Sequence, residues 1–379
     1  MKKGILIAFG ELFLKSERVR SLFLQKLVKN ISLSLTKSKI KFNIYPSRER
    51  IFVETEEVEK ASKIIKNVFG ISWFCEAIFL ENGIEEVLDF VEKNYEKWIK
   101  KNQTFAIRLK KGNLKESGEE IIRRVASKIE RKVDLERPDV ELFIEARKSG
   151  WFIYFKKKKG KGGLPVGTGG KALALISGGI DSPVASYLIA KRGSENVWLH
   201  FHSFPLVSNS SIQKVKELAE IFLNYQPKLK IYFVPFHKIQ MEVKACVQPN
   251  YRILIYRRMM LRIAEKIAEK ENCNGIVTGE SLAQVSSQTL KNLRIIEEVT
   301  SLPILRPLIG FDKEEIIKLA KKIGTYEISI KPQEDCCTLF TPKHASAAGN
   351  FELVKKFEEK LNIKEMIEMA LKESEIEFY

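Results

Sequence analysis

The chain contains little cysteine and no long apolar run. Its 379 residues include five Cys, an odd number, with no Cys-x-x-Cys and no spacing typical of metal ligands. No apolar stretch is long enough to span a bilayer, and Met1-Lys2-Lys3-Gly4 leads into a strand-like segment, not a signal peptide. We therefore expect a cytoplasmic protein with free thiols, and neither a membrane protein nor a disulfide-stapled secreted domain.

Positive charge is concentrated in the first half of the chain. Residues 1–170 contain 36 Lys and Arg against 23 Asp and Glu, a net charge of +13, whereas the remainder has 29 against 25, a net charge of +4. A basic half predicts a polyanionic partner, most simply nucleic acid. The alternative is the Lys- and Glu-rich surface of a heat-adapted protein, but that would raise both signs and does not explain the asymmetry.

The most informative stretch is ISGGIDSP, residues 176–183. An apolar, strand-like segment precedes it, and a helical pattern follows it, with Pro183 at the helix start and Gly193 just past the end. A strand–turn–helix unit of this kind directs backbone N–H groups and the positive end of a helix dipole at one point, where phosphate binds. An ordinary glycine turn with an Asx cap is the alternative, but it needs only one glycine.

The residues of this loop have separate chemical uses. Gly178 and Gly179 permit positive φ and close approach of the backbone to phosphate oxygens. Ser177 and Ser182 have hydroxyls that can donate hydrogen bonds, and Asp181 can hold Mg²⁺ against the phosphates. Ser-Gly-Gly-x-Asp-Ser resembles the signature of the PP-loop ATP pyrophosphatases. That resemblance implies ATP, split between its α- and β-phosphates so that AMP activates a substrate oxygen.

The first 60 residues predict a ferredoxin-like α+β domain. Short strand and helix signals follow one another in the order βαββα. The expected strands are 4–10, 41–45 and 50–54, and the expected helices are 21–35 and 56–67.

Residues 61–165 predict a second α+β unit. Helices are expected at 85–100 and 117–131, and strands at 104–110, 140–146 and 151–155. Val133-Asp134-Leu135 followed by Pro138-Asp139, between a helix and a strand pair, is similar to the THUMP domain. This resemblance implies an RNA-binding module.

Residues 166–379, after a Lys- and Gly-rich linker, alternate strands and helices. The expected strands are 172–176, 197–201, 230–234, 275–278 and 302–305; the expected helices are 183–192, 211–223, 251–270 and 312–323, with a helical tail from about Glu352. Such alternation predicts an α/β doubly wound parallel sheet, which binds ligands beyond the carboxyl ends of its strands.

Two further segments are candidates for nucleotide contacts. His200-Phe201-His202 ends the second expected strand, where its backbone could read adenine, although these could equally be ordinary strand-end residues. Arg257 interrupts an apolar helix face, as arginines near phosphate do, although a snorkelling arginine is the alternative.

A later block makes the resemblance specific. TGESLAQVSSQT (residues 278–289), LRPL (305–308) and DKEEI (312–316) are similar to the corresponding blocks of the bacterial tRNA 4-thiouridine synthases, or tRNA sulfurtransferases. The resemblance covers essentially the whole chain. It implies that Asp181 and Lys313 are needed for activity, a surface helical lysine being the alternative for Lys313. It also implies ATP contacts at Leu175, Ile176, His200, Phe201, Arg257, Gly279 and Gln288.

Adjacent cysteines, Cys336 and Cys337, follow an acidic pair. In a reducing compartment they are poor structural staples, and a thiolate there could take over the sulfur of a persulfide. Two packed small residues are the alternative. The family resemblance favours Cys336 as the sulfur-handling thiol, with Cys337 still open. Cys75, Cys246 and Cys273 are expected to be inert.

Together these features predict an enzyme that adenylates a uridine of tRNA, at position 8 by the resemblance, and replaces its O4 with persulfide sulfur. Some family members carry a C-terminal rhodanese domain that is not seen before Tyr379, so we expect a separate persulfide donor, such as a cysteine desulfurase or rhodanese-type protein. A role in thiazole synthesis is then in doubt. A homodimer is implied by the resemblance alone. The alternatives are a 2-thiouridine or lysidine synthase, and an RNA-binding protein with an inactive nucleotide fold.

Overall fold

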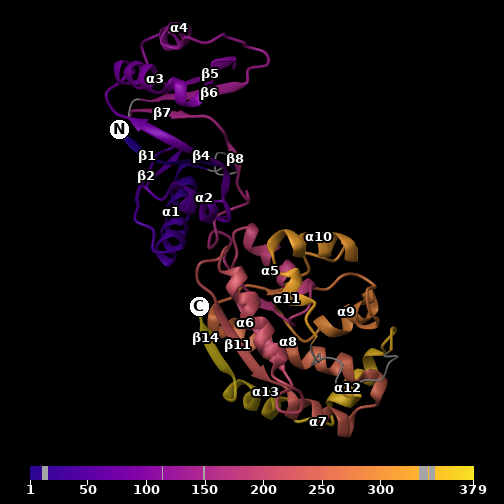
Figure 1. Ribbon diagram of the computed structural model, residues 1–379. Helices are drawn as coiled ribbons and strands as arrows, with labels where there is room; N and C mark the ends of the chain where they lie inside the picture. The colour runs from indigo at the N-terminus through magenta and orange to yellow at the C-terminus, as the bar shows by residue number, and fades with distance from the viewer. Residues whose placement is uncertain (11–15, 113, 148–149, 333–339, 341–345) are drawn as a thin grey trace. The chain divides into compact units, whose positions relative to one another are not determined.

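A computed structural model describes residues 1–10, 16–112, 114–147, 150–332, 340 and 346–379 (Figure 1). The chain divides into two compact units, Met1–Gly163 and Leu164–Tyr379, and each is described by itself.

The N-terminal unit is built on one mixed sheet. Over the described residues its strand order is β2-β3-β1-β4-β7-β6-β5, and β8 pairs with β4. The first part has the expected βαββα order, and α1 and α2 pack on β1 and β3 through residues such as Leu27, Ile31 and Ile65. The elements are β1 (Lys2–Phe9), α1 (Glu17–Lys37), β2 (Asn43–Pro46), β3 (Ile51–Glu54) and α2 (Val58–Ile65).

The second part of this unit continues the same sheet. Strand β4 pairs antiparallel with β1 on one side and with β7 on the other, while β5 and β6 are parallel. The division that the sequence predicts between residues 60 and 61 falls inside α2, and it stays a prediction. The elements are β4 (Ile71–Leu80), α3 (Ile84–Trp98), β5 (Phe105–Lys111), α4 (Gly118–Ala126), β6 (Val140–Arg147), β7 (Gly150–Tyr154) and β8 (Lys158–Lys159).

A buried ion-pair network joins the two parts of the N-terminal unit. The Glu145 side chain, in β6, is 1% exposed. Its Oε1 accepts hydrogen bonds from Arg50 Nη2 at 2.8 Å and Tyr154 Oη at 3.1 Å, and its Oε2 lies 2.6 Å from Arg147 Nη2. Burial alone would raise the pKa of Glu145, but the two guanidinium groups outweigh it and hold that pKa below its usual value. Arg50, just before β3, thereby ties the first part of the unit to the β6–β7 hairpin.

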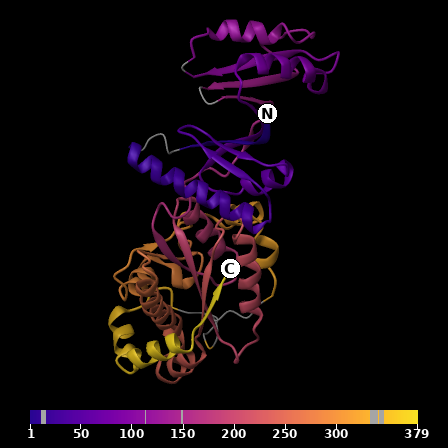
Figure 2. The same ribbon diagram turned by 90° about the vertical axis from the view of Figure 1, so that its left-hand side faces the viewer.

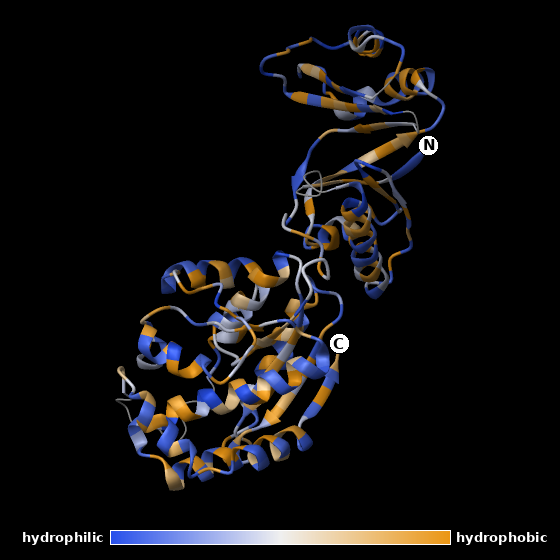
Figure 3. Cartoon of the chain, turned by 180° about the vertical axis from the view of Figure 1, so that it is seen from behind, coloured by the Kyte–Doolittle hydropathy of each residue, from blue (hydrophilic) through white to orange (hydrophobic). Residues whose placement is uncertain are grey.

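The C-terminal unit is a doubly wound α/β fold. Its strand order is β13-β12-β9-β10-β11-β14, and all neighbours are parallel except β14, which pairs antiparallel with β11. Helices α5, α6, α10 and α11 cover one face, and α7, α8, α9, α12 and α13 cover the other (Figures 1 and 2). The helices carry both apolar and polar segments, as amphipathic helices packed on a sheet do (Figure 3).

The strands and helices of this unit include all those expected from the sequence, and α7, α9 and α11 are additional. The strands are β9 (Lys171–Leu175), β10 (Glu195–His202), β11 (Lys230–Pro235), β12 (Ile276–Val277), β13 (Ile304–Leu305) and β14 (Glu375–Phe378). The helices are α5 (Asp181–Lys191), α6 (Ser210–Phe222), α7 (His237–Cys246), α8 (Arg252–Glu271), α9 (Leu290–Glu297), α10 (Lys313–Ile323), α11 (Tyr326–Ser329), α12 (Phe351–Glu358) and α13 (Ile363–Lys372). The fold class predicted from the sequence is therefore confirmed.

The C-terminal tail differs from the expectation of an all-helical end. After α12 and α13 the chain adds β14 to the sheet, with Glu375 opposite Phe233 and Phe378 opposite Lys230. A four-residue strand has too short a pattern to be recognised in the sequence, and it forms because β11 offers unpaired backbone groups at the sheet edge.

We predict that Arg50→Met strongly destabilises the N-terminal unit. It leaves the buried Glu145 carboxylate with one guanidinium fewer, which costs about 3 kcal/mol. Urea unfolding of the whole chain measures this change. Arg48→Met is the matched control, because Arg48 has a 73% exposed side chain and pairs only with exposed Glu17 among the contacts described; equal midpoints for both variants would contradict the assigned role of Glu145.

Candidate functional site

The loop between β9 and α5 has the geometry of an anion-binding turn. Gly178 has φ of +81°, a conformation that favours glycine. The Ser182 hydroxyl accepts a hydrogen bond from Ser177 N at 3.1 Å and lies 3.3 Å from Ser177 Oγ, so the turn closes on itself. Helix α5 begins at Asp181, which puts Pro183 in its first turn and not at its first position. A missing N–H costs no helical bond there, because the first N–H groups of a helix have no partner within it.

Asp181 is held by two groups from distant parts of the chain. Its Oδ1 lies 2.6 Å from Lys313 Nζ, and its Oδ2 accepts a hydrogen bond from Gln284 Nε2 at 3.1 Å. Lys313 is the first residue of α10, whose N-terminus is fixed by a capping box between Asp312 and Glu315. The two residues that the family resemblance marks as needed for activity are thus in direct contact.

Gly279 brings the 278–289 block against the loop. A Cβ on Gly279 would lie 2.7 Å from Ser182 N and 2.9 Å from Asp181 C, both backbone atoms that cannot move aside. Glycine is therefore required by close packing on the first turn of α5. This approach is what allows Gln284 to reach Asp181.

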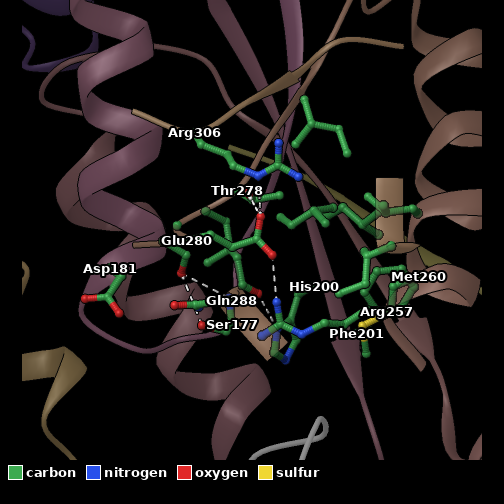
Figure 4. A pocket seen from close by; sticks show the side chains of 18 of the residues that line it. Ser177, Asp181, His200, Phe201, Arg257, Met260, Thr278, Glu280, Gln288 and Arg306 are labelled. Atoms are coloured by element: carbon green, nitrogen blue, oxygen red, sulfur yellow. Dashed lines mark hydrogen bonds and ion pairs between the residues drawn. The ribbon is translucent and has the colours of Figure 1, made fainter. Parts of the chain in front are cut away.

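Glu280 fixes two arginines in the wall of the site. Its Oε1 lies 2.7 Å from Arg257 Nη1, and its Oε2 lies 2.8 Å from Arg306 Nε and accepts a hydrogen bond from Thr278 at 2.9 Å. Figure 4 shows Glu280 between the two guanidinium groups, with Asp181 on the side of α5. Burial by itself lowers the pKa of Arg306, but Glu280 and Glu297 outweigh it, so the pKa is raised and the arginine stays charged.

His200 is a buried, neutral connector and not an exposed strand-end residue. It is 2% exposed. Its Nδ1 donates to Ile176 O at 2.7 Å, because a carbonyl can only accept, and Nε2 then accepts from Ser211 Oγ at 3.1 Å. Burial lowers the pKa of His200 to about 4, with the hydrogen bond to Ile176 opposing this. The ring therefore holds the end of β9 to β10.

These groups surround one cavity of about 300 Å³ at the carboxyl edge of the sheet. One part of its lining is polar and includes the loop and Glu280; the other is apolar and includes Leu199, Met260 and Ile304. Of the predicted site residues, the structure brings the following to its lining: Leu175, Ile176, Ser177, Asp181, Ser182, His200, Phe201, Arg257, Gly279 and Gln288.

The other predicted site residues that the structure describes do not line the cavity. Gly178 and Gly179 form the turn, and Lys313 joins the site through Asp181. Cys336 and its alternative Cys337 lie outside the described residues. Glu280 and Arg306 were not predicted as site residues, although Glu280 lies in the block at 278–289 and Arg306 in the block at 305–308. The available signal was a charged residue after each of two adjacent short strands.

Two of the other three thiols, Cys75 and Cys273, are poor nucleophiles by position. Cys75 and Cys273 are buried, and burial raises the pKa of both thiols, that of Cys273 to about 11. Within the described part of the chain, no three His, Cys, Asp or Glu side chains gather as a metal-binding cluster. Among the same residues, no helix is both long and apolar enough to cross a membrane.

Comparison with known families assigns most of the chain. Residues 167–363 match the model described as thiamine biosynthesis protein (ThiI), residues 4–75 the ThiI ferredoxin-like domain, and residues 84–156 the THUMP domain. A probable tRNA sulfurtransferase of Caldanaerobacter subterraneus subsp. tengcongensis is 40% identical over 97% of this chain and 98% of its own length. The chain belongs to the ThiI family. A second ThiI-family relative, a probable tRNA sulfurtransferase of Acetivibrio thermocellus, is 39% identical over 99% of this chain and 98% of its own length.

A solved structure agrees with this ThiI-family assignment, and a second one shares the fold. A 4-thiouridine synthetase, crystallised as an RNA complex with bound ATP, is 35% identical, covers 100% of both chains and superposes with a TM-score of 0.90. A Pyrococcus horikoshii protein, 22% identical over 85% of this chain and 99% of its own, has a TM-score of 0.65 and shows the fold alone.

We predict that this ThiI-family chain loses stability as the pH falls from 6.5 towards 4, in part through His200. The unfolded imidazole has a pKa of about 6.5, whereas the folded one stays neutral down to about 4. The contribution, about 3 kcal/mol, is therefore present above pH 6.5 and lost on acidification. His200→Asn keeps a donor for Ile176 O but cannot titrate. Its thermal midpoint should fall less between pH 7 and 5 than that of the wild type, and parallel curves would refute this.

Proposed function

We propose that this protein is an ATP-dependent tRNA sulfurtransferase that converts a uridine of tRNA, at position 8, to 4-thiouridine. The observation that carries the proposal is the cavity that joins the Ser177–Ser182 loop, the Asp181–Lys313 pair and an apolar recess. Relatives about 40% identical are named for this activity, and a structure of a 4-thiouridine synthetase 35% identical to this chain contains RNA and ATP.

ATP fits the two parts of the cavity by its chemistry. The apolar recess suits the adenine ring, and the first N–H groups of α5, which have no partner within the helix, suit the phosphates. Arg257, held by Glu280, adds positive charge beside them. The contacts proposed from the sequence at Leu175, Ile176, Phe201 and Gln288 belong to this wall.

Mg²⁺ fits this site as a bridging ion. Mg²⁺ is commonly bound through one or two carboxylates together with substrate phosphates, and not by an all-protein cage. Asp181 would supply that carboxylate, since each oxygen accepts only one described hydrogen bond and keeps a further lone pair. When bound, the ion would neutralise phosphate charge. Lys313, beside Asp181, places a second positive charge at the same point.

The first chemical step is adenylation of the base. The uridine O4 attacks the α-phosphate, the bond to the β-phosphate breaks, and pyrophosphate leaves with the bonding electrons. The base loses its N3 proton to solvent as the C4=N3 double bond forms. The chain's residues align the reactants and stabilise the developing negative charge through the loop N–H groups, Lys313 and Arg257.

The second step delivers sulfur. The terminal sulfur of a persulfide, carried on Cys336, attacks C4, and AMP leaves with the electrons of the C4–O bond. A thiol then cleaves the S–S bond, which leaves the sulfur on the base and a disulfide for a dithiol reductant to reduce. The donor of the persulfide is a separate protein, a cysteine desulfurase or a rhodanese-type carrier.

The basic first half of the chain completes the proposal. Residues 1–60 and 61–165 would act as ferredoxin-like and THUMP domains that hold tRNA by its backbone and shape, and residues 166–379 as the catalytic domain. We further propose a cytoplasmic location and a homodimer. A contribution to thiazole synthesis would need the same persulfide on Cys336.

The central test incubates the protein with tRNA, Mg-ATP and a persulfide donor. We expect pyrophosphate and a thiolated base in equal amounts. Asp181→Asn should lower pyrophosphate release by roughly a hundredfold or more, because an uncharged amide neither holds the ion nor pairs with Lys313. tRNA affinity should change little, which a filter-binding assay checks. Failure of the wild type to release pyrophosphate would overturn the proposal.

Single substitutions distinguish the roles of the two adjacent cysteines. Cys336→Ser should abolish thiolation while pyrophosphate is still released, because adenylation needs no thiol. Cys337→Ser should retain thiolation within about threefold of the wild type. The reverse pattern would assign the role to Cys337, and full activity in both variants would remove the sulfur relay from the mechanism.

A further inference from the structure

Asn292 is a fully buried amide in the first turn of α9, with 0% exposure. Its Nδ2 donates to Ser286 O at 2.7 Å and to Ser346 O at 2.9 Å, and its Oδ1 accepts from Gly349 N at 2.9 Å. Two donors thus face two carbonyls, and the acceptor faces an N–H group, so the amide orientation is fixed. One side chain thereby ties two segments that are 60 residues apart in sequence.

The first of these segments belongs to the nucleotide cavity. Ser286 begins the short 3-10 turn Ser286–Gln288, and Gln288, which is 7% exposed, lines the cavity. The hydrogen bond from Asn292 Nδ2 to Ser286 O therefore holds the start of the turn that presents Gln288.

The second segment is the return of the chain after the adjacent cysteines. Ser346 and Gly349 follow Cys336 by 10 and 13 residues in the sequence. Thr289 adds a second tie, because its hydroxyl donates to Ala347 O at 2.8 Å while accepting from Asn292 N. A Cβ on Gly349 would lie 3.0 Å from Asn292 Oδ1 and 2.7 Å from Leu254 Cδ1, so the segment is pressed against α8 and α9.

Two more contacts hold the same stretch of chain from other elements. Arg252, the first residue of α8, donates from Nη1 to Phe340 O at 2.7 Å. Lys214, which is 3% exposed in α6, donates to the carbonyls of Ser329 at 3.2 Å and of Lys331. Residues on either side of Cys336 are therefore anchored within the C-terminal unit. The anchor formed by Thr289 and Asn292 directly follows Gln288 of the cavity wall in the sequence.

We infer that Asn292, supported by Thr289, is a positioning residue that couples nucleotide binding at Gln288 to the delivery of sulfur by the cysteine segment. This inference rests on the proposed function. It assigns Asn292 no contact with ATP or with the base. Its effect is to keep the turn at 286–288 and the segment at 346–349 in one fixed arrangement, so that the adenylated base and the sulfur meet before water hydrolyses the adenylate.

The test measures two products in the same reaction, pyrophosphate and 4-thiouridine, with tRNA, Mg-ATP and a cysteine desulfurase plus cysteine as the persulfide source. Asn292→Ala should lower the yield of 4-thiouridine per pyrophosphate by roughly tenfold, because small misplacement of reacting groups has effects of that size. Pyrophosphate release itself should fall by less than about threefold. A loss of folded protein lowers both products equally, so the ratio reports positioning and not stability.

Asn196→Ala is the matched control. Asn196 is also a buried amide, 1% exposed, and it bonds to Ser186 in the same unit, but it lies near the amino end of β10, away from the cavity. Its substitution should lower both products in parallel and leave the ratio at the wild-type value.

Substitutions of Thr289 provide a second test in case the Asn292→Ala variant does not fold. Thr289→Val removes the hydroxyl at nearly constant volume and should lower the ratio by about threefold, whereas Thr289→Ser keeps the hydroxyl and should match the wild type. An unchanged ratio in Asn292→Ala, or in Thr289→Val if the first variant is unfolded, would overturn the coupling role. A wild-type protein that makes neither product would instead overturn the proposed function.

Discussion

The close packing of Gly279 on the first turn of α5 is the constraint on which the site depends. With no side chain at this position, the loop after β12 lies directly on the backbone of Asp181 and Ser182. Gln284 then reaches Asp181, and Glu280 stands where it can bind both Arg257 and Arg306. A methyl group at residue 279 would collide with fixed backbone atoms, and the loop, the acidic residue and the arginines would no longer share one cavity.

Charge balance is the second constraint on this cavity. Lys313, Arg257 and Arg306 bring positive charge to one edge of the sheet, and Asp181, Glu280 and Glu297 pair with them. Because Glu280 and the two arginines are largely buried and paired with one another, the desolvation of these three charges is offset before any ligand arrives. The cavity remains favourable for an anionic ligand through the positive dipole end at the N-terminus of α5.

The sequence predicted most of the strands and helices of the C-terminal unit because their signals are local. A buried strand, a glycine turn and a helix with proline in its first turn identify the loop at 176–183, and strand–helix alternation identifies the parallel sheet. Three features could not be predicted from the sequence: the β14 strand, the continuous sheet through β4 and the neutral state of His200. Each depends on a partner far away in the chain, such as β11 for β14 or Ser211 for His200.

The sequence by itself determined the fold class, the family resemblance and the residue types available for phosphate chemistry, since these follow from composition, periodicity and short motifs. Only the tertiary structure decided which of those residues meet. It placed Lys313 on Asp181, gave Glu280 and Arg306 a shared place in the cavity wall, and tied Asn292 to the chain that follows the cysteines. Contacts between residues 26 to 132 positions apart arise from the packing of elements, and no local pattern encodes them.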